Sequence, residues 1–258
     1  MHPVLIDFGR FKIYSYGVFI CIGFFIGLFL AQKEAKRCNL SPDSISDLAS
    51  YLLIGAIIGS RLLYVIDNWR YYSENPLEIF MIWQGGLIFF GGLILDIFIC
   101  FLYLWRHKLP FWETLDTISP SVAIGQGFGR IGCLFAGCCY GKPTDVPWAI
   151  AFNNPLSLAP QGVSLHPTQL YSSFSNFMIF FFLFFLQRKE KRFPGQIACS
   201  YIILSCLFRF FIENLRGDKR VYIIPDILSE AQLISLIFIA VFLSVMFYLR
   251  KRSISYIE

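Results

Sequence analysis

The sequence predicts an all-α integral membrane protein with about seven transmembrane helices. Hydrophobic residues make up 56% of the 258 residues and charged residues only 15%. Apolar stretches of about 20 residues, the length that crosses a bilayer as a helix, recur along the whole chain. The net charge is +5, but the basic residues lie mostly in short clusters between these stretches. We therefore expect a single polytopic domain over residues 1–258 that lies in a lipid bilayer and has no nucleic-acid partner.

The predicted spans follow one another with short connections, except for one long loop. The first is too long for a cleavable signal peptide, has no basic leader with an evident cleavage site, and is followed by further spans. The fourth is the weakest, because it is rich in Gly and Ser and contains Arg130; a broken or re-entrant segment is an open alternative there. The seven stretches are Tyr14–Gln32, Leu48–Ile66, Gly86–Trp105, Thr117–Ala136, Gln169–Leu186, Gln196–Leu215 and Ala231–Leu249.

The loops differ in their content of Lys and Arg, which predicts the orientation. Alternate loops hold 12 basic residues against 7 in the other set, and cytoplasmic loops are the richer ones. The carboxyl terminus is therefore predicted to be cytoplasmic and the amino terminus to lie outside. Residues 139–168, between the fourth and fifth spans, then form an outer loop region. The richer set is Lys33, Lys36, Arg37, Arg106, Lys108, Arg188, Lys189, Lys191, Arg192, Arg250, Lys251 and Arg252.

The fourth stretch contains the most informative motif, an arginine among glycines. The run from Gly125 to Gly132 reads Gly-Gln-Gly-Phe-Gly-Arg-Ile-Gly, with the arginine at position 130. A cation in hydrocarbon costs about 2.5 kcal/mol or more and persists only with a partner. Glycines allow close backbone approach and can direct N–H groups at an anion. The motif therefore predicts a site for a lipid phosphate. A dinucleotide fingerprint is rejected, because no strand precedes the run.

Other polar residues are predicted to lie near the outer side, and each could have a structural role instead of a role in a binding site. Arg209 and Glu213 are four residues apart, so they could be an intrahelical ion pair. Arg61 could bond to a carbonyl of another span, and His166 could be an ordinary loop residue. Arg216 could be an interfacial anchor whose head group reaches water. Phosphate recognition by bidentate guanidinium groups is the alternative for the arginines.

Eight cysteines are present, and three of them lie close together in sequence. Cys133, Cys138 and Cys139 do not have the spacing of a zinc site, and a disulfide between the two adjacent residues would be strained. We expect them to be small packing residues, although a metal or a disulfide on the outer side stays open. No metal and no cofactor are predicted.

Several short motifs, in this order along the chain, resemble the bacterial prolipoprotein diacylglyceryl transferase family. The resemblance covers nearly the whole chain. Each motif is weak alone, but their order, spacing and seven-span frame are specific together. They are Tyr16-Gly17, Gly59-Ser60-Arg61, Trp83 to Leu87 with Gly91-Gly92-Leu93-Ile94, Gly129-Arg130-Ile131-Gly132, His166 to Tyr171, and Phe208-Arg209 with Glu213 and Arg216.

The resemblance implies an activity and roles for these residues. That family transfers the diacylglyceryl group of phosphatidylglycerol to the lipobox cysteine thiol of a preprolipoprotein in the bacterial inner membrane, and glycerol-1-phosphate leaves. It implies that Arg130, Arg216 and His166 are catalytic. It also implies that the substrates are bound or shaped by Tyr16, Arg61, Gly85, Gly86, Gly91, Gly92, Gly129, Gly132, Gln169, Arg209 and Glu213.

The sequence departs from the family pattern at four positions. Phe90 stands where the family usually has a histidine, so a mechanism that uses that histidine as base cannot operate here. Cys133 stands where the family usually has an asparagine, and Ala136 and Cys138 replace a second asparagine and an acidic residue. Two other functions therefore stay open: a related transferase with another acceptor, and a non-catalytic protein that binds or moves phospholipid.

The predicted orientation can be tested by labelling single cysteines. In a variant without other cysteines, Asp145→Cys should react in intact cells with a thiol reagent that cannot cross the membrane, whereas Lys189→Cys should not, because only the first lies in the outer loop region. Reaction at position 189 with protection at position 145 would reverse the orientation.

Overall fold

The structure is a computed structural model that describes residues 2–7, 9, 12–218, 222–224 and 228–254. Contacts divide the chain into two compact units. One comprises Met1–Ala31 and Leu115–Glu258, and the other comprises Gln32–Thr114. A single membrane domain over residues 1–258 stays a prediction.

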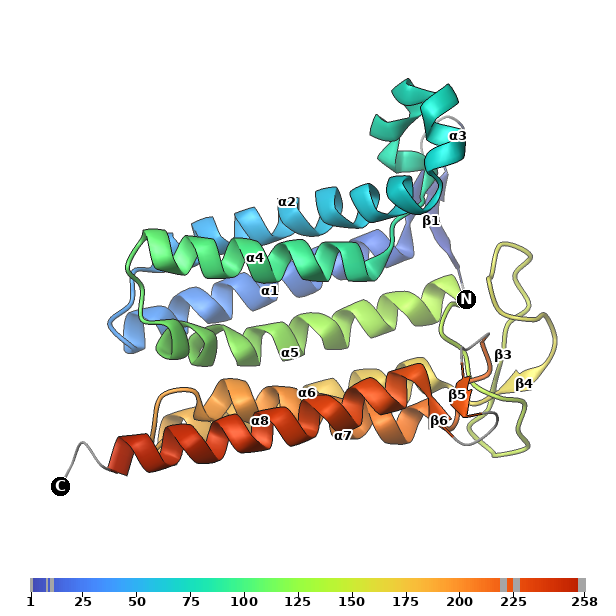
Figure 1. Cartoon of the computed structure of the whole chain (residues 1–258). Coiled ribbons are helices and arrows are strands. Elements are labelled where there is room, and N and C mark those ends of the chain that lie inside the picture. Colours follow the sequence, from blue (N-terminus) through green and yellow to red (C-terminus); the bar gives the residue numbers. More distant parts are fainter. Residues whose placement is uncertain (1, 8, 10–11, 219–221, 225–227, 255–258) are drawn as a thin grey trace. The chain divides into compact units, whose positions relative to one another are not determined.

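Helices make up most of the chain (Figure 1). The long helices cover the predicted apolar stretches, although α2 and α5 begin six residues earlier than predicted. A helix satisfies its own backbone polar groups, which a segment in lipid requires. The α-helices are α1 (Ser15–Arg37), α2 (Pro42–Asp67), α3 (Trp69–Glu74), α4 (Phe89–Arg106), α5 (Phe111–Ala136), α6 (Thr168–Lys189), α7 (Gln196–Glu213) and α8 (Glu230–Ile254), with two short 3₁₀ helices, η1 (Pro76–Phe80) and η2 (Ile82–Gln84).

Within the described residues, six helices are long and apolar enough to cross a membrane: α1, α2, α4, α6, α7 and α8. This confirms the class of all-α membrane protein, and the number of seven spans stays a prediction. The fourth predicted span lies in α5, which is not one of the six. It is nevertheless a continuous helix of 26 residues that contains Pro120, so the structure does not show the broken segment considered above.

Three small antiparallel pairs of strands supplement the helices. They join segments outside the long helices, where backbone N–H and C=O groups need partners. The pairs are β1 (Val4–Asp7) with β2 (Lys12–Tyr14), β3 (Ile150–Ala151) with β4 (Ser164–Leu165), and β5 (Tyr222–Ile224) with β6 (Leu228–Ser229).

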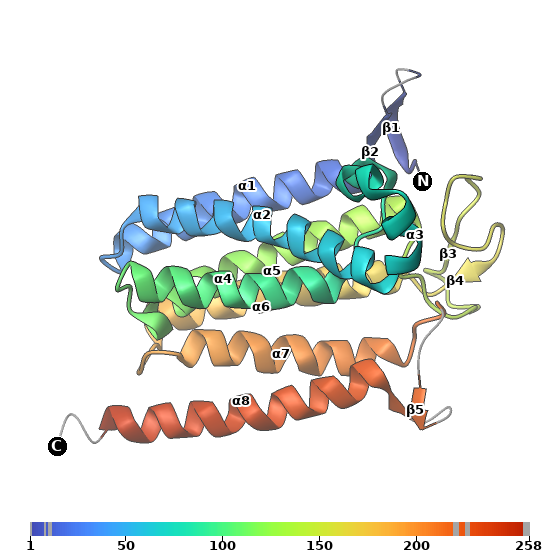
Figure 2. The same cartoon turned by 45° about the horizontal axis from the view of Figure 1, so that its top comes forward.

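In the first unit, glycines bring α1 close to α5. A Cβ atom added to Gly23 would lie 3.0 Å from the Gly125 carbonyl oxygen, and one added to Gly27 would lie 3.0 Å from that of Ser121. Helices α6, α7 and α8 lie side by side (Figure 2). A buried cluster of Ala123, Ile179, Phe180, Leu183 and Ile197 joins α5, α6 and α7.

A buried carboxylate fixes the start of α7 in this unit. Asp116, on α5, accepts hydrogen bonds from the backbone N–H groups of Gly195 at 2.8 Å and Ala198 at 2.9 Å. Its other partner is the Lys191 ammonium group at 2.9 Å. The carboxylate thus satisfies N–H groups that the first turn of a helix leaves without partners.

In the second unit, α2 and α4 cross at small residues. A Cβ atom on Gly59 would run into the Gly91 carbonyl oxygen, and one on Gly91 would run into that of Gly59. A Cβ atom on Gly92 would lie 2.8 Å from the Ala56 carbonyl oxygen. Small residues allow helix backbones to approach in this way in membranes, where lipid supplies no hydrophobic drive for association.

Gly59→Ala should therefore destabilise the second unit. The methyl group has to push the α4 backbone away, which typically costs about 1–3 kcal/mol. The measurement is thermal unfolding in detergent, with Gly17→Ala as control, because a Cβ atom on Gly17 meets nothing within 4 Å. Equal unfolding temperatures of the two variants would contradict this account of the crossing.

Candidate active site

The carboxyl-terminal end of α5 brings two cysteines together. Gly137 adopts a left-handed conformation with φ +73°. Its N–H bonds to the Leu134 carbonyl, and the Cys138 N–H bonds to the Cys133 carbonyl, both at 3.2 Å. These two bonds form a Schellman motif, in which the second residue after the helix returns to the residue five positions earlier. Cys133 and Cys138 are therefore neighbours because of how the helix ends.

A third cysteine completes the cluster. Cys139 also has a left-handed backbone, with φ +58°, which is uncommon for a residue other than glycine. The sulfur atoms of Cys133, Cys138 and Cys139 all lie within 4.8 Å of one another, and none is in a disulfide. We refer to these three residues as the thiol cluster.

The first residues of α6 hold the backbone of this turn. The Thr168 hydroxyl donates to the Cys139 carbonyl at 2.7 Å, and the Gln169 side-chain amide donates to the Cys138 carbonyl at 2.8 Å. Both side chains are almost completely buried. Gln169 therefore positions the thiol cluster, and its predicted role in binding substrate stays a prediction.

Strand-like pairing brings Arg216 beside the thiol cluster. Gly141 pairs with Arg216, and the Gly217 N–H bonds to the Tyr140 carbonyl at 3.0 Å. The Arg216 guanidinium is buried and makes a bidentate pair with Asp218, with Nε to Oδ1 at 3.0 Å and Nη2 to Oδ2 at 2.8 Å. Because the group is buried, this arginine is not an interfacial anchor that reaches into water.

Arg130 differs from Arg216, since its guanidinium has no hydrogen bond or ion pair with any residue that the structure describes. It is half-buried on α5, and its charge acts on Cys133 and Cys139. The neighbouring glycines differ. A Cβ atom on Gly129 would meet nothing within 4 Å, whereas one on Gly132 would lie 3.2 Å from Tyr16. Tyr16 of α1 thus covers one side of the motif.

The thiol cluster favours one thiolate. Hydrogen bonds from Cys133 and Cys138 hold the pKa of Cys139 well below the ordinary thiol value, and the charges of Arg216 and Arg130 lower it further. The pKa of Cys138 is raised, because its proton is shared with Cys133 and Cys139. Negative charge is therefore stabilised at Cys139 by its two neighbouring thiols and by the charges of two guanidinium groups.

The two candidate bases have different surroundings. His166 is half-buried; its Nδ1 lies 3.3 Å from the Tyr171 hydroxyl, which also accepts a bond from Trp148 Nε1 at 2.6 Å. Glu213 is buried, and Oε2 lies 3.9 Å from Nη2 of Arg209. The intrahelical pair considered above is thus present, and the catalytic and binding roles of these residues stay predictions.

The second unit contains a separate arginine centre. Arg61 is buried and donates to the carbonyls of Glu78 at 2.6 Å, Ile79 at 2.9 Å, Gly85 at 2.8 Å and Gly86 at 3.3 Å. Gly85 and Gly86 both have positive φ, 89° and 74°, and this conformation presents their carbonyls to the guanidinium.

Aromatic rings enclose the same guanidinium. The Arg61 Cζ atom lies 5.7 Å from the Tyr64 ring centroid and 5.2 Å from that of Tyr72. With its hydrogen bonds directed at carbonyls and its faces covered, Arg61 ties the segment before α4 to α2. The packing interpretation of Arg61 therefore accounts for every contact observed, and its binding of substrate stays a prediction.

Residues after Gly86 fall on the amino-terminal part of α4. Gly91 and Gly92 form the close crossing with α2, which explains the glycines without a ligand. Phe90, at the position where the family usually has a histidine, is 52% exposed and packs edge to face against Phe89. An imidazole would therefore fit at position 90 without displacing a core side chain.

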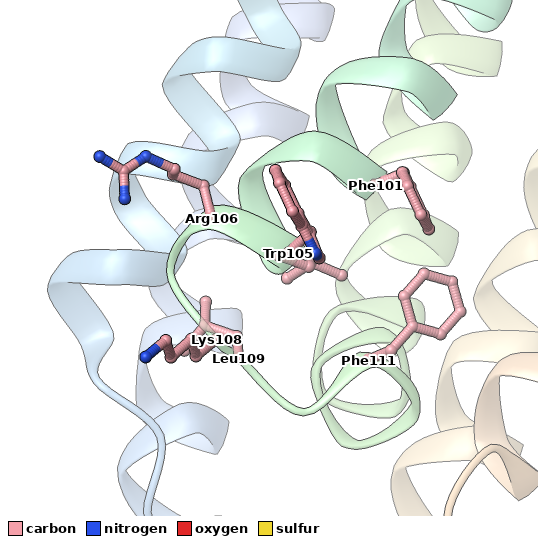
Figure 3. Close-up of a pocket in the computed structure, with 7 residues that line it drawn as sticks. Phe101, Trp105, Arg106, Lys108, Leu109 and Phe111 are labelled. Atoms are coloured by element: carbon pink, nitrogen blue, oxygen red, sulfur yellow. The ribbon is translucent and has the colours of Figure 1, made fainter.

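A hollow of about 600 Å³ lies at the other end of α4 (Figure 3). Phe101, Trp105 and Phe111 present their rings to it, and Arg106 and Lys108 point away from these rings. An aromatic and basic lining is typical of a membrane interface. The hollow is therefore unrelated to Arg61, whose partners precede α4.

Fold and site together define a polytopic helical membrane protein that holds two guanidinium groups beside a thiol cluster. Its sequence matches the family described as prolipoprotein diacylglyceryl transferase over residues 3–248. The chain belongs to this family, as the resemblance predicted.

Several relatives align with this chain over most of their own length. A phosphatidylglycerol–prolipoprotein diacylglyceryl transferase of Clostridium tetani is 39% identical over 236 residues, covering 92% of this chain and 93% of the relative. The enzyme of the same name from Finegoldia magna is 40% identical over 221 residues, covering 86% and 85%. That from Halalkalibacterium halodurans is 35% identical over 256 residues, covering 98% and 88%.

Arg61→Lys should destabilise the second unit. A lysine keeps the charge but cannot reach several carbonyls with one planar group, so buried acceptors lose their donors, at about 1–3 kcal/mol each. Thermal unfolding in detergent measures the loss, with Arg106→Lys as control on the exposed end of α4. If the Arg61 variant unfolds like the control but fails to bind phospholipid, Arg61 is a binding residue instead.

Proposed function

We propose that this protein transfers the diacylglyceryl group of phosphatidylglycerol to the lipobox cysteine thiol of preprolipoproteins and releases glycerol-1-phosphate. Membership of the family and the names of the relatives support the reaction. The site supports it through one observation above the others: a half-buried arginine among the glycines of α5, without an acidic partner among the described residues. Besides the Cys139 thiolate, on which its charge acts, the lipid phosphate is the anion that the reaction brings to this cation.

The two arginines would have unequal roles. Arg130, with its donors available, would bind the phosphate in a bidentate manner. Arg216 is already paired with Asp218, so it would contribute positive charge at a fixed position and would not bind the phosphate in a bidentate manner. As the C–O bond breaks, charge grows on the phosphate oxygens, and preorganised cations stabilise this charge most. Catalysis by Arg130 and Arg216 is therefore proposed as electrostatic.

The remaining residues would shape the two substrate paths. Tyr16 and Gly132 would bound the headgroup beside Arg130, and Gly129 leaves open space next to that arginine in the chain. His166 would accept the thiol proton of the acceptor, with Glu213 as the alternative base. Gly85, Gly86, Gly91, Gly92 and Arg209 would contribute by holding their helices in place.

Location follows from the same reaction. We place the protein in the bacterial cytoplasmic membrane, with the amino terminus outside, the carboxyl terminus inside and residues 139–168 on the outer side. Lipid donor and lipobox acceptor would then meet at the outer leaflet. The basic-residue asymmetry supports this orientation.

The exposed Phe90 favours two other candidate functions, one catalytic and one not. Without a histidine at that position, the chain lacks one titratable group of the family pattern. A transferase that uses a different acceptor, or a phospholipid-binding protein without activity, would tolerate this loss. Retention of Arg130, His166, Gln169 and Arg216 supports the enzyme.

Complementation tests the reaction directly. The chain is expressed in cells depleted of their own transferase, and the mass of a reporter lipoprotein is measured. A diacylglyceryl increment on the lipobox cysteine is expected. An unmodified reporter, with the chain correctly inserted in the membrane, would refute the proposal.

Arg130→Lys should reduce transfer at least tenfold, about 1.4 kcal/mol in the transition state, because the bidentate contact is lost while the charge remains. The assay uses purified protein, phosphatidylglycerol and a lipobox peptide. Arg188→Lys is the matched control, at the far end of α6. A normal rate for Arg130→Ala would exclude Arg130 from phosphate binding.

A further inference from the structure

Within the described residues, the thiol cluster is the only group of three or more Cys, His, Asp or Glu side chains placed closely enough to share one metal ion. The spacing in sequence does not reveal it, because two of its residues meet through the Schellman turn and the third through a left-handed residue. The structure thus changes the expectation that these cysteines are only small packing residues.

We propose that Cys133, Cys138 and Cys139 bind one zinc ion as thiolates, and that its fourth position receives the acceptor thiol. Catalytic zinc sites have this composition: three protein ligands and one open position. The second part of the proposal rests on the proposed function.

Geometry supports the ligand set. Zinc–sulfur bonds of about 2.3 Å in a tetrahedron separate two sulfurs by about 3.8 Å. The three sulfurs already lie within 4.8 Å of one another, about 1 Å from that separation, a difference of the size that a side-chain rotation covers. The backbone of Cys138 and Cys139 is held in place by Thr168 and Gln169, which prepares the site before a metal binds.

Charge supports the same ligand set. Three thiolates and one Zn²⁺ carry a net charge of −1, which would be costly in partly buried surroundings without compensation. Arg130 lies one helical turn before Cys133 on α5 and provides this compensation, while the charge of Arg216, beside the cluster through its pairing with Gly141, is balanced by Asp218. A disulfide would use two of the sulfurs, leave the third unused and place no demand on a cation.

A zinc ion at this site would promote loss of the acceptor thiol's proton, a task for which Phe90 has no titratable group. A thiol that coordinates zinc loses its proton outright. In the proposed step, the acceptor thiol binds zinc and releases its proton to His166, the base proposed above. Its sulfur then attacks the glyceryl carbon that carries the phosphate. An S–C bond forms, and the bond between that carbon and the phosphate ester oxygen breaks. The electron pair leaves with glycerol-1-phosphate, whose additional negative charge faces Arg130 and Arg216.

The first measurement concerns metal binding and needs no activity. Purified full-length protein in detergent is reduced, stripped of metal, and titrated with Co²⁺, whose thiolate complexes absorb by charge transfer. One Co²⁺ per chain is expected, displaced by one Zn²⁺. Cys133→Ser and Cys139→Ser should each weaken binding at least tenfold, whereas Cys21→Ser, an exposed cysteine of α1, should not. Thermal unfolding of each variant checks that it is folded.

Wild-type protein that binds no Co²⁺, or binds it as well when Cys133 or Cys139 is serine, would overturn the metal site. This result stands without any assay of transfer, and the wild-type titration stands even if a variant does not fold.

The second measurement concerns the open position. A lipobox peptide should change the Co²⁺ spectrum to that of four thiolates, and the same peptide with serine in place of cysteine should not. Removing metal should lower transfer at least tenfold, and Zn²⁺ should restore it. Equal rates with and without metal would overturn activation of the acceptor. Absence of transfer under both conditions, with a normal Co²⁺ spectrum, would instead refute the proposed function.

Discussion

The site depends on one short stretch of backbone, residues 138–142, whose polar groups are bonded to three helices or their extensions. The preceding turn closes α5, the carbonyls of Cys138 and Cys139 bind side chains of α6, and Lys142 N–H bonds to the Leu215 carbonyl at 2.8 Å, just after α7. Cys138 and Cys139 are half-buried and Gly141 is buried, so their backbone groups depend on these partners for most of their hydrogen bonding. The thiol cluster and the backbone that carries Arg216 are therefore held together by the same set of bonds.

Much of the fold was accessible from the sequence. Apolar length alone located α1, α2, α4, α6, α7 and α8, since a bilayer imposes both length and composition on a helix. α5 shows the limit of this reasoning: Gly, Ser and Arg130 weaken its hydropathy, yet it is a continuous helix. Packing against α1 through Gly23 and Gly27, and against α6 and α7 through Ala123, stabilises it, and such contacts are not visible in a window of hydropathy.

The candidate site was accessible only in part. An arginine among glycines pointed to Arg130, but the thiol cluster follows from the way α5 ends, and a sequence spacing does not reveal a left-handed residue at Cys139. Asp218 was also missed as the partner of Arg216, although an acidic residue two positions from an arginine in a turn is a local signal. Arg61 shows the opposite case. Its motif suggested a substrate contact, whereas four carbonyls and two rings surround its side chain.

The cap of α7 by Asp116 has a consequence for biosynthesis. Lys191, which pairs with Asp116, comes 75 residues later in the chain. Gly195 and Ala198, whose N–H groups donate to the same carboxylate, come later still. At roughly 5–20 residues per second, the ribosome needs about 4–15 s to make that stretch. During this interval a charged α5 has no partner for its carboxylate, so its first turns have to stay in contact with water. The start of α5 can therefore reach its final place only after the loop between α6 and α7 has been synthesised. Helices α5, α6 and α7 thus assemble together rather than in succession.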